Sequence, residues 1–106
     1  MYARIARFEG VDPAAVDDQI AEMRSQIEAD EPPADAPEEM RTLMETVGRF
    51  MQLVDRETGT FVGIIFCDSE DKMRRADEAL NRMSPGDSGG RRTAADIYEV
   101  AIDKTF

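Results

Sequence analysis

The 106-residue sequence contains no histidine and no tryptophan, and its one cysteine is Cys67. Histidine is the usual acid or base at physiological pH and the commonest metal ligand, so its absence excludes Ser-His-Asp and Cys-His catalysis and argues against a metal centre. A single thiol cannot form an internal disulfide, and no CxxC pair is present, which is typical of a reducing compartment. We therefore expect a cytoplasmic protein that needs no metal and no cofactor.

Long apolar runs and basic residues are also scarce. No stretch approaches the roughly 20 apolar residues that a membrane span needs, and the first ten residues alternate apolar and charged side chains, unlike a signal peptide. Lys and Arg total 13 against 23 Asp and Glu, which gives a formal net charge of -10. Such a surface repels phosphate backbones and anionic lipid, so we expect neither a nucleic-acid nor a membrane partner.

The segment from Phe50 to Cys67, FMQLVDRETGTFVGIIFC, predicts two strands joined by a turn. Pairing them across residues 56–59 places Val54 opposite Phe61 and Gln52 opposite Gly63. One face of the hairpin is then wholly apolar: Met51, Leu53, Val62, Ile64 and Phe66. The other face carries small and polar interruptions: Phe50, Gln52, Val54, Phe61, Gly63, Ile65 and Cys67. We expect helices on the first face and a pocket or partner on the second, unless a bulge at Gly59 shifts the register.

Leaving the second face in water would be costly. Four of its side chains would each forgo roughly 1.5 to 3 kcal/mol if exposed: Phe50, Val54, Phe61 and Ile65. The sum is comparable with the roughly 5 to 15 kcal/mol stability of a small domain. A second copy of the chain is the simplest cover, and the alternative is that loops or the tail cover this face within one chain.

The remaining segments predict a strand and two helical pieces before this hairpin, and a helix and a strand after it. Tyr2–Glu9 alternates like a strand, with Tyr2 and Arg4 on one face. Asp12 followed by Pro13 predicts the start of a helix, and contact between Val11 and Val16 would form a hydrophobic staple there. Its apolar stripe is Val16, Ile20, Met23 and Ile27. Residues 30–37 are proline-rich and predict a loop, after which a short helix carries the stripe Met40, Leu43, Met44 and Val47.

After the hairpin, Asp68 is the predicted N-cap of a last helix, whose inward stripe is Met73, Ala76, Leu80 and Met83. On its outer face we expect three i,i+4 ion pairs: Glu70–Arg74, Asp71–Arg75 and Glu78–Arg82. Residues 84–90 predict a connection, and residues 96–103 a final strand. Right-handed crossovers then give a single α+β domain over residues 1–106, a ferredoxin-like βαββαβ unit. It has a four-stranded antiparallel sheet with helices on one side and the other side bare.

Three segments resemble the dimeric alpha+beta barrel superfamily, and within it the antibiotic-biosynthesis-monooxygenase (ABM)-like group: MYARIARFEG, LVDRETGTFVGIIF and CDSEDKMRRADEALNRM. The resemblance implies a homodimer whose sheets meet face to face, with a cavity in each subunit between sheet and helices. The superfamily includes cofactor-free oxygenases, haem-degrading enzymes and proteins without known activity, so the fold does not fix a reaction. Its haem degraders hold iron with a histidine, which this chain lacks, and we do not expect that mechanism here.

The polar or reactive side chains that could line such a cavity are Tyr2, Arg4, Gln52, Cys67 and Tyr98. Cys67 precedes a helix N-terminus, which could lower its pKa, although Asp68 and other acids beside it oppose this. One hypothesis is a module that binds a small apolar or aromatic molecule beside Met-rich helices. The alternative is a cofactor-independent monooxygenase for a polycyclic phenol or quinol, in which tyrosine, arginine or a carboxylate assists deprotonation. We favour binding.

Overall fold

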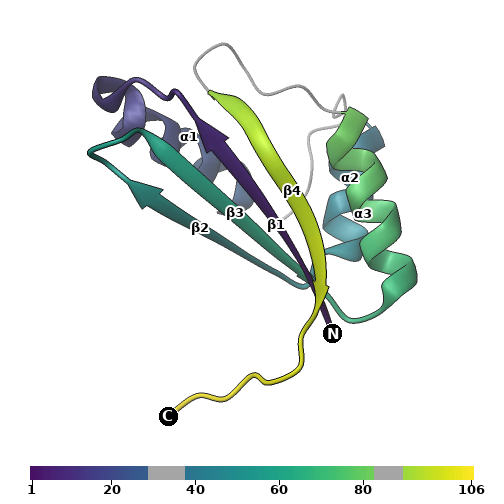
Figure 1. The fold of residues 1–106 in the computed structure, drawn as a ribbon. Coiled ribbons are helices and arrows are strands. Elements are labelled where there is room, and N and C mark those ends of the chain that lie inside the picture. Colours follow the sequence, from purple (N-terminus) through teal and green to yellow (C-terminus); the bar gives the residue numbers. More distant parts are fainter. Residues whose placement is uncertain (29–37, 83–89) are drawn as a thin grey trace.

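A computed structural model describes residues 1–28, 38–82 and 90–106, with the side chains of Gln26 and Ile27 left out. The strands form one antiparallel sheet in the order β2-β3-β1-β4, and the helices lie on one side of it (Figure 1). The elements are β1 (Tyr2–Glu9), the 3-10 helix η1 (Pro13–Ala15), α1 (Val16–Glu28), α2 (Glu38–Thr46), β2 (Arg49–Asp55), β3 (Thr60–Cys67), α3 (Glu70–Arg82) and β4 (Arg91–Glu99). This architecture confirms the ferredoxin-like α+β prediction.

The hairpin of β2 and β3 has the register predicted from the sequence. Val54 pairs with Phe61 and Gln52 with Gly63, without a shift at Gly59. The Asp55 carboxylate accepts hydrogen bonds from the N–H groups of the turn, and Gly59 has a φ of +68°, which glycine adopts readily. The Val11 N–H donates to the Gly59 carbonyl at 3.1 Å, so the turn is tied to the end of β1.

The predicted roles of the two sheet faces were wrong. Phe61, Ile65 and Cys67 are buried and belong to the helix-packed core, whereas the wholly apolar face is uncovered, and Leu53 on it is 48% exposed. Figure 1 shows this uncovered face toward the viewer, with α1 behind the sheet. An apolar pattern predicts that a face is buried, but it does not predict what buries it. Here the helices pack on the face that carries the small and polar residues.

The buried side chains form two separate clusters on the covered face. Near the hairpin turn, Val11 and Val16 pack with Phe61, which confirms the predicted staple. At the other end of the sheet the cluster consists of Ile65, Cys67, Met73 and Ala76, with Tyr2, Leu43, Val47 and Leu80 packed against it. The core is therefore divided along the strands, with α1 serving one cluster and α2 with α3 the other.

The starts of the helices partly follow the prediction. Asp12 caps as expected, because its carboxylate accepts the Ala14 N–H at 3.0 Å, although the first turn is 3-10 rather than α. Asp68 is not the cap of α3. The Ser69 hydroxyl accepts a hydrogen bond from the Lys72 N–H at 3.2 Å instead. Serine, one position later, also supplies a side-chain oxygen for a free N–H group of the first helical turn.

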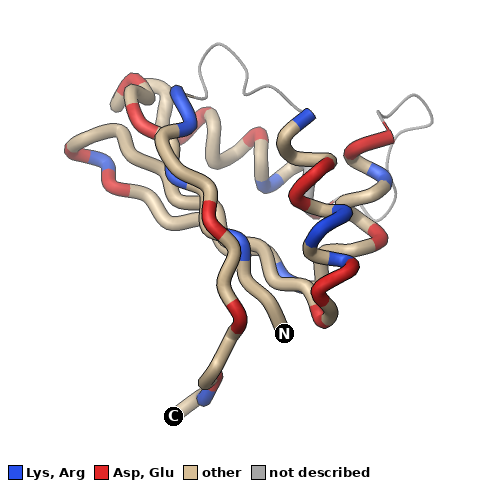
Figure 2. The backbone as a smooth tube through the Cα atoms, turned by 45° about the vertical axis from the view of Figure 1, so that its right-hand side comes forward, with Lys and Arg blue, Asp and Glu red and all other residues tan. Residues whose placement is uncertain are grey.

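Many residues of α2 and α3 are charged, as the coloured backbone in Figure 2 shows. Two predicted ion pairs form, Glu70–Arg74 and Glu78–Arg82, while Arg75 pairs with Glu45 of α2 rather than with Asp71. This cross-helix pair exists only because α2 lies beside α3. In the described part of the chain, the helices are too short or too polar to cross a membrane.

Strand β4 differs from its prediction. It covers Arg91–Glu99 rather than residues 96–103, because it pairs along the whole length of β1, and an edge strand tolerates charged side chains. Residues 100–106 run away from the body of the protein, with Ile102 88% exposed (Figure 1). The loop predicted at 30–37, most of the connection predicted at 84–90, and Met83 lie outside the described residues.

Substituting the two positive-φ glycines near the hairpin turn tests how firmly the turn is tied to β1. A Cβ at Gly59 would overlap the Val11 carbonyl oxygen, whereas a Cβ at Gly10 would meet no heavy atom within 4 Å. We expect Gly10→Ala to lower the free energy of unfolding by about 1 to 2 kcal/mol, from backbone strain alone. Gly59→Ala should lower it by at least about 3 kcal/mol, because steric overlap adds to that strain. Equal losses in urea denaturation would contradict this packing.

Candidate functional site

A row of small or polar side chains crosses the covered face between the two core clusters. From β2 to β4 its members are Gln52, Gly63, Ala6 and Ala95. The neighbouring rows contain larger residues: Phe50, Ile65, Arg4 and Ile97 on one side, and Val54, Phe61, Phe8 and Arg92 on the other. Apart from Gln52, the members of this small-residue row have shorter side chains than the residues in the rows on both sides.

The row is more open at its β3 end than over β1. A Cβ added to Gly63 would have as its nearest described heavy atom the Phe50 Cε2, at 4.0 Å, which leaves room above the strand. Ala6, one strand further, is only 3% exposed. Edge-strand side chains on this face are also incompletely covered, with Phe50 36% and Ile97 46% exposed. The arrangement favours a site entered near Phe50 and closed toward β1.

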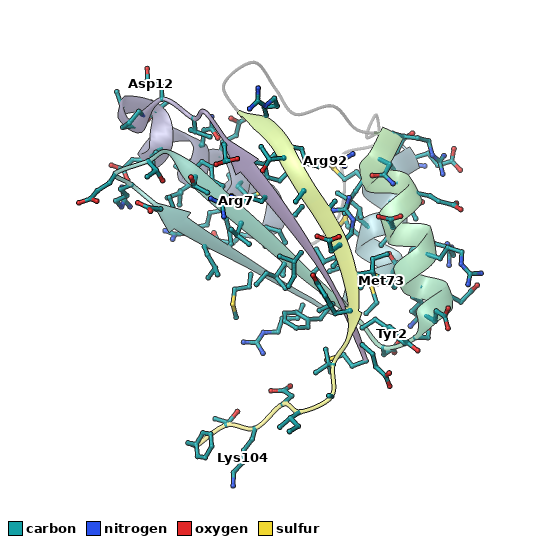
Figure 3. All side chains as sticks on the ribbon, in the orientation of Figure 1. Tyr2, Arg7, Asp12, Met73, Arg92 and Lys104 are labelled. Atoms are coloured by element: carbon teal, nitrogen blue, oxygen red, sulfur yellow. The ribbon has the colours of Figure 1, made fainter. Side chains whose placement is uncertain are left out.

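A polar network joins α3 to the closed end of the row. Arg4, only 4% exposed, donates from Nε to Asp77 Oδ1 at 2.8 Å and from Nη2 to Asn81 Oδ1 at 3.3 Å. Arg92 donates from Nη1 to the same Asn81 oxygen at 2.9 Å. Figure 3 labels Arg92 between β4 and α3. Arg4 and Arg92 come from the two rows that flank the small-residue row, so their guanidinium groups converge over it. This network contains two guanidinium groups and one carboxylate.

Gln19 adds an unsatisfied polar group on α1. Its side-chain nitrogen Nε2 is buried and has no hydrogen-bond partner among the described residues. Gln19 lies one helical turn after Val16, which packs in the cluster near the hairpin turn. A buried amide without a partner costs free energy, so a polar atom of a bound molecule would find a ready donor here.

Cys67 is buried in the core rather than exposed in a pocket. It is 1% exposed and packs with Met73 and Ala76. Burial raises the pKa of the Cys67 thiol, the neighbouring Asp68 raises it further, and Lys72 acts in the opposite direction. The thiol therefore stays protonated at neutral pH and fits neither a nucleophile nor an iron-binding thiolate. The described residues contain no group of three or more His, Cys, Asp or Glu side chains placed to hold a metal.

The predicted lining residues separate between the two faces. Tyr2, Arg4, Gln52 and Cys67 lie on the covered face by their register, while Tyr98 pairs with Ala3 and lies on the uncovered one. Their role in a pocket stays a prediction. Asp77, Asn81, Arg92 and Gln19 were not predicted as site residues. The spacing of Asp77 and Asn81 beside the stripe of α3 could have indicated a polar flank, but not its partners.

A second hollow lies at the turn end of the hairpin. It has a volume of about 360 Å³ and is lined by Arg7, Glu9, Leu53, Val54, Asp55, Thr58, Thr60 and Val62. Several of these residues belong to the uncovered face, so a partner on that face would border it. The charged groups in it include the Arg7–Glu9 pair, 3.4 Å apart and exposed, which suggests no particular chemistry.

No family model matches the sequence, and no curated protein matches it either. Among solved structures, the chain is similar to a mutant of MhuD crystallised with two manganese protoporphyrin IX molecules bound per active site. The TM-score is 0.59 with 14% sequence identity, over 100% of both chains. At this identity the likeness shows the shared fold alone, and it agrees with the ferredoxin-like α+β architecture described above.

The raised pKa of Cys67 predicts slow thiol chemistry in the folded protein. With 5,5′-dithiobis(2-nitrobenzoate) at pH 8, we expect labelling at least about tenfold slower than in urea-unfolded chain, because the buried thiol is neutral and shielded. The shift favours the protonated folded state, so its stabilising contribution is present below the ordinary thiol value of 9.0 and is lost as pH rises through the folded pKa. Labelling as fast as in the unfolded chain would contradict this environment; Cys67→Ser provides the blank.

Proposed function

We propose that the protein binds a small planar apolar or aromatic molecule between the sheet and its helices. The observation that carries the proposal is the small-residue row between two separate core clusters, with room above Gly63. Small side chains in the middle of a covered sheet leave space that larger side chains, like those of the neighbouring rows, would occupy. Ligand sites in proteins are mostly apolar concavities with a few placed polar groups, and Gln19, Arg4 and Arg92 would supply those groups here.

The chemistry of the walls and the structural comparison both favour a flat apolar ligand. The Phe50 ring lies beside the open end, and an aromatic ligand could stack against it. MhuD, which has a similar fold, is a protein with porphyrins in its active site. Haem itself fits poorly, because the chain has no histidine and Cys67 is buried as a neutral thiol. We place binding ahead of the oxygenase alternative, since Tyr98 lies on the other face and Arg4 is held by Asp77 and Asn81.

We also propose that the protein is a homodimer formed through its uncovered face. The apolar side chains on this face are Ala3, Ile5, Met51, Leu53, Val62, Ile64, Phe66 and Tyr98. The chain exposes 7497 Å², whereas a compact monomer of this mass exposes about 6,000 Å². A standard interface buries roughly 800 Å² on each partner.

Filling the space above Gly63 should weaken ligand binding. We use 9-anthracenemethanol as a neutral fluorescent probe and expect the wild-type protein to bind it. Gly63→Leu should weaken binding by about tenfold or more, because displacing roughly 60 Å² of apolar contact forfeits about 1.5 kcal/mol. Gly63→Ala is the matched control, since its Cβ makes only ordinary contact with Phe50. Unchanged binding by a folded Gly63→Leu variant would place the ligand elsewhere.

Placing a charge on the uncovered face should separate the protomers. Sedimentation velocity at micromolar concentration should show dimers of the wild-type protein. Leu53→Glu should give folded monomers, because an unpaired carboxylate buried in the interface costs on the order of 3 kcal/mol. Leu53→Met keeps an apolar side chain and should remain dimeric. Well-folded wild-type monomers under these conditions would rule out this interface.

A further inference from the structure

We infer that the ligand of this site carries a carboxylate, which the guanidinium groups of Arg4 and Arg92 bind. The inference rests on the proposed function and names the class of molecule: a planar aromatic acid. It follows from the network at the closed end of the small-residue row, where two arginines from different strands meet at Asn81 Oδ1. Arg4 and Arg92 lie together beside this row although the chain as a whole has a net charge of -10.

Among the described residues, this network contains more positive than negative charge. Asp77 accepts from Arg4 at 2.8 Å and also from the Asn81 Nδ2 at 3.3 Å. The hydrogen bond of Arg92 goes to a neutral amide oxygen, so the two guanidinium groups share one carboxylate. Arg4 is buried and paired with Asp77, whereas Arg92 is exposed, so Arg92 is the guanidinium group whose remaining donors a ligand can reach. An anion at this end of the row would complete the network.

The unused donors match a carboxylate in geometry. A guanidinium has five N–H donors; the hydrogen bonds described above use Nε and Nη2 of Arg4 and Nη1 of Arg92. The planar guanidinium fork binds carboxylates through paired hydrogen bonds. One net positive charge suits a monoanion better than a dianionic phosphate. The row would hold the apolar rings, and its closed end would hold the acid group.

The two arginines differ in what they can contribute. Arg4 is buried and fixed by two partners on α3, so it also supports the packing of that helix. Arg92 is exposed on the edge strand β4 and is the better target for mutation. Its neighbour Arg91 carries the same charge, and strand alternation directs its side chain toward the other face. Arg91 is therefore a matched control for loss of one positive charge.

The experiment compares anthracene-9-carboxylate with the neutral 9-anthracenemethanol by fluorescence titration at pH 7.5 and 0.1 M salt. The wild-type protein should bind the acid about tenfold or more tightly than the alcohol, the ratio expected for a hydrogen bond to a charged group. Arg92→Gln should weaken the acid far more than the alcohol and so lose most of this preference, and Arg91→Gln should keep it. Asp77→Asn retains an acceptor for Arg4 but removes the competing charge, so it should strengthen acid binding severalfold.

Each other outcome has a definite reading. Equal binding of acid and alcohol by the wild-type protein overturns the carboxylate inference and leaves the apolar site intact. Equal effects of Arg91→Gln and Arg92→Gln also overturn it, because they indicate general electrostatic attraction. A loss of both probes in Arg92→Gln, with the fold verified by circular dichroism, assigns Arg92 a structural role and overturns it too. If neither probe binds the wild-type protein, the proposed function fails, and this inference fails with it.

Discussion

Four strands present apolar side chains on both faces of one sheet, while the helices of a short chain cover only one of them. The rest of the structure depends on this imbalance. On the covered face, α1 packs near the hairpin turn and the α2–α3 pair packs at the other end, and each forms its own buried cluster. On the other face, Leu53 and Tyr98 stay about half exposed. Burying such side chains is the main favourable term available to a small domain, so the uncovered face favours a second copy.

The division of the core into two clusters has a consequence for binding. If the helices packed evenly over the sheet, the middle of the covered face would need large side chains to fill it. Instead Gly63 and Ala6 occupy the two central strands there, and larger residues lie on both sides. A depression of this kind costs stability when it is empty, because its lining atoms lack contact partners. Its retention is easier to understand if a ligand supplies those contacts.

The polar groups around this depression support the same interpretation. Arg4 and Arg92 lie on different strands and meet at a single residue of α3, and Gln19 contributes a buried nitrogen without a described partner. A purely structural network would be expected to balance its charges and satisfy its buried donors. Among the described residues, the excess of positive charge and the unsatisfied amide agree with the proposed ligand site. Cys67, the residue whose reactivity the sequence suggested, belongs to the packed core.

The sequence by itself determined the strand-helix-strand order of each half, the register of the hairpin and the exclusion of histidine chemistry. These features depend on local patterns: alternation with a period of two, glycine in the turn, and the residue types present. Only the tertiary structure decided which apolar face contacts the helices. In it the cap of α3 is Ser69 rather than the predicted Asp68, and β4 begins at Arg91 rather than at residue 96. The tertiary structure also brought Arg4, Asp77 and Arg92 together. Contacts between segments more than ten residues apart depend on how whole elements pack, and no local pattern in the sequence specifies that packing.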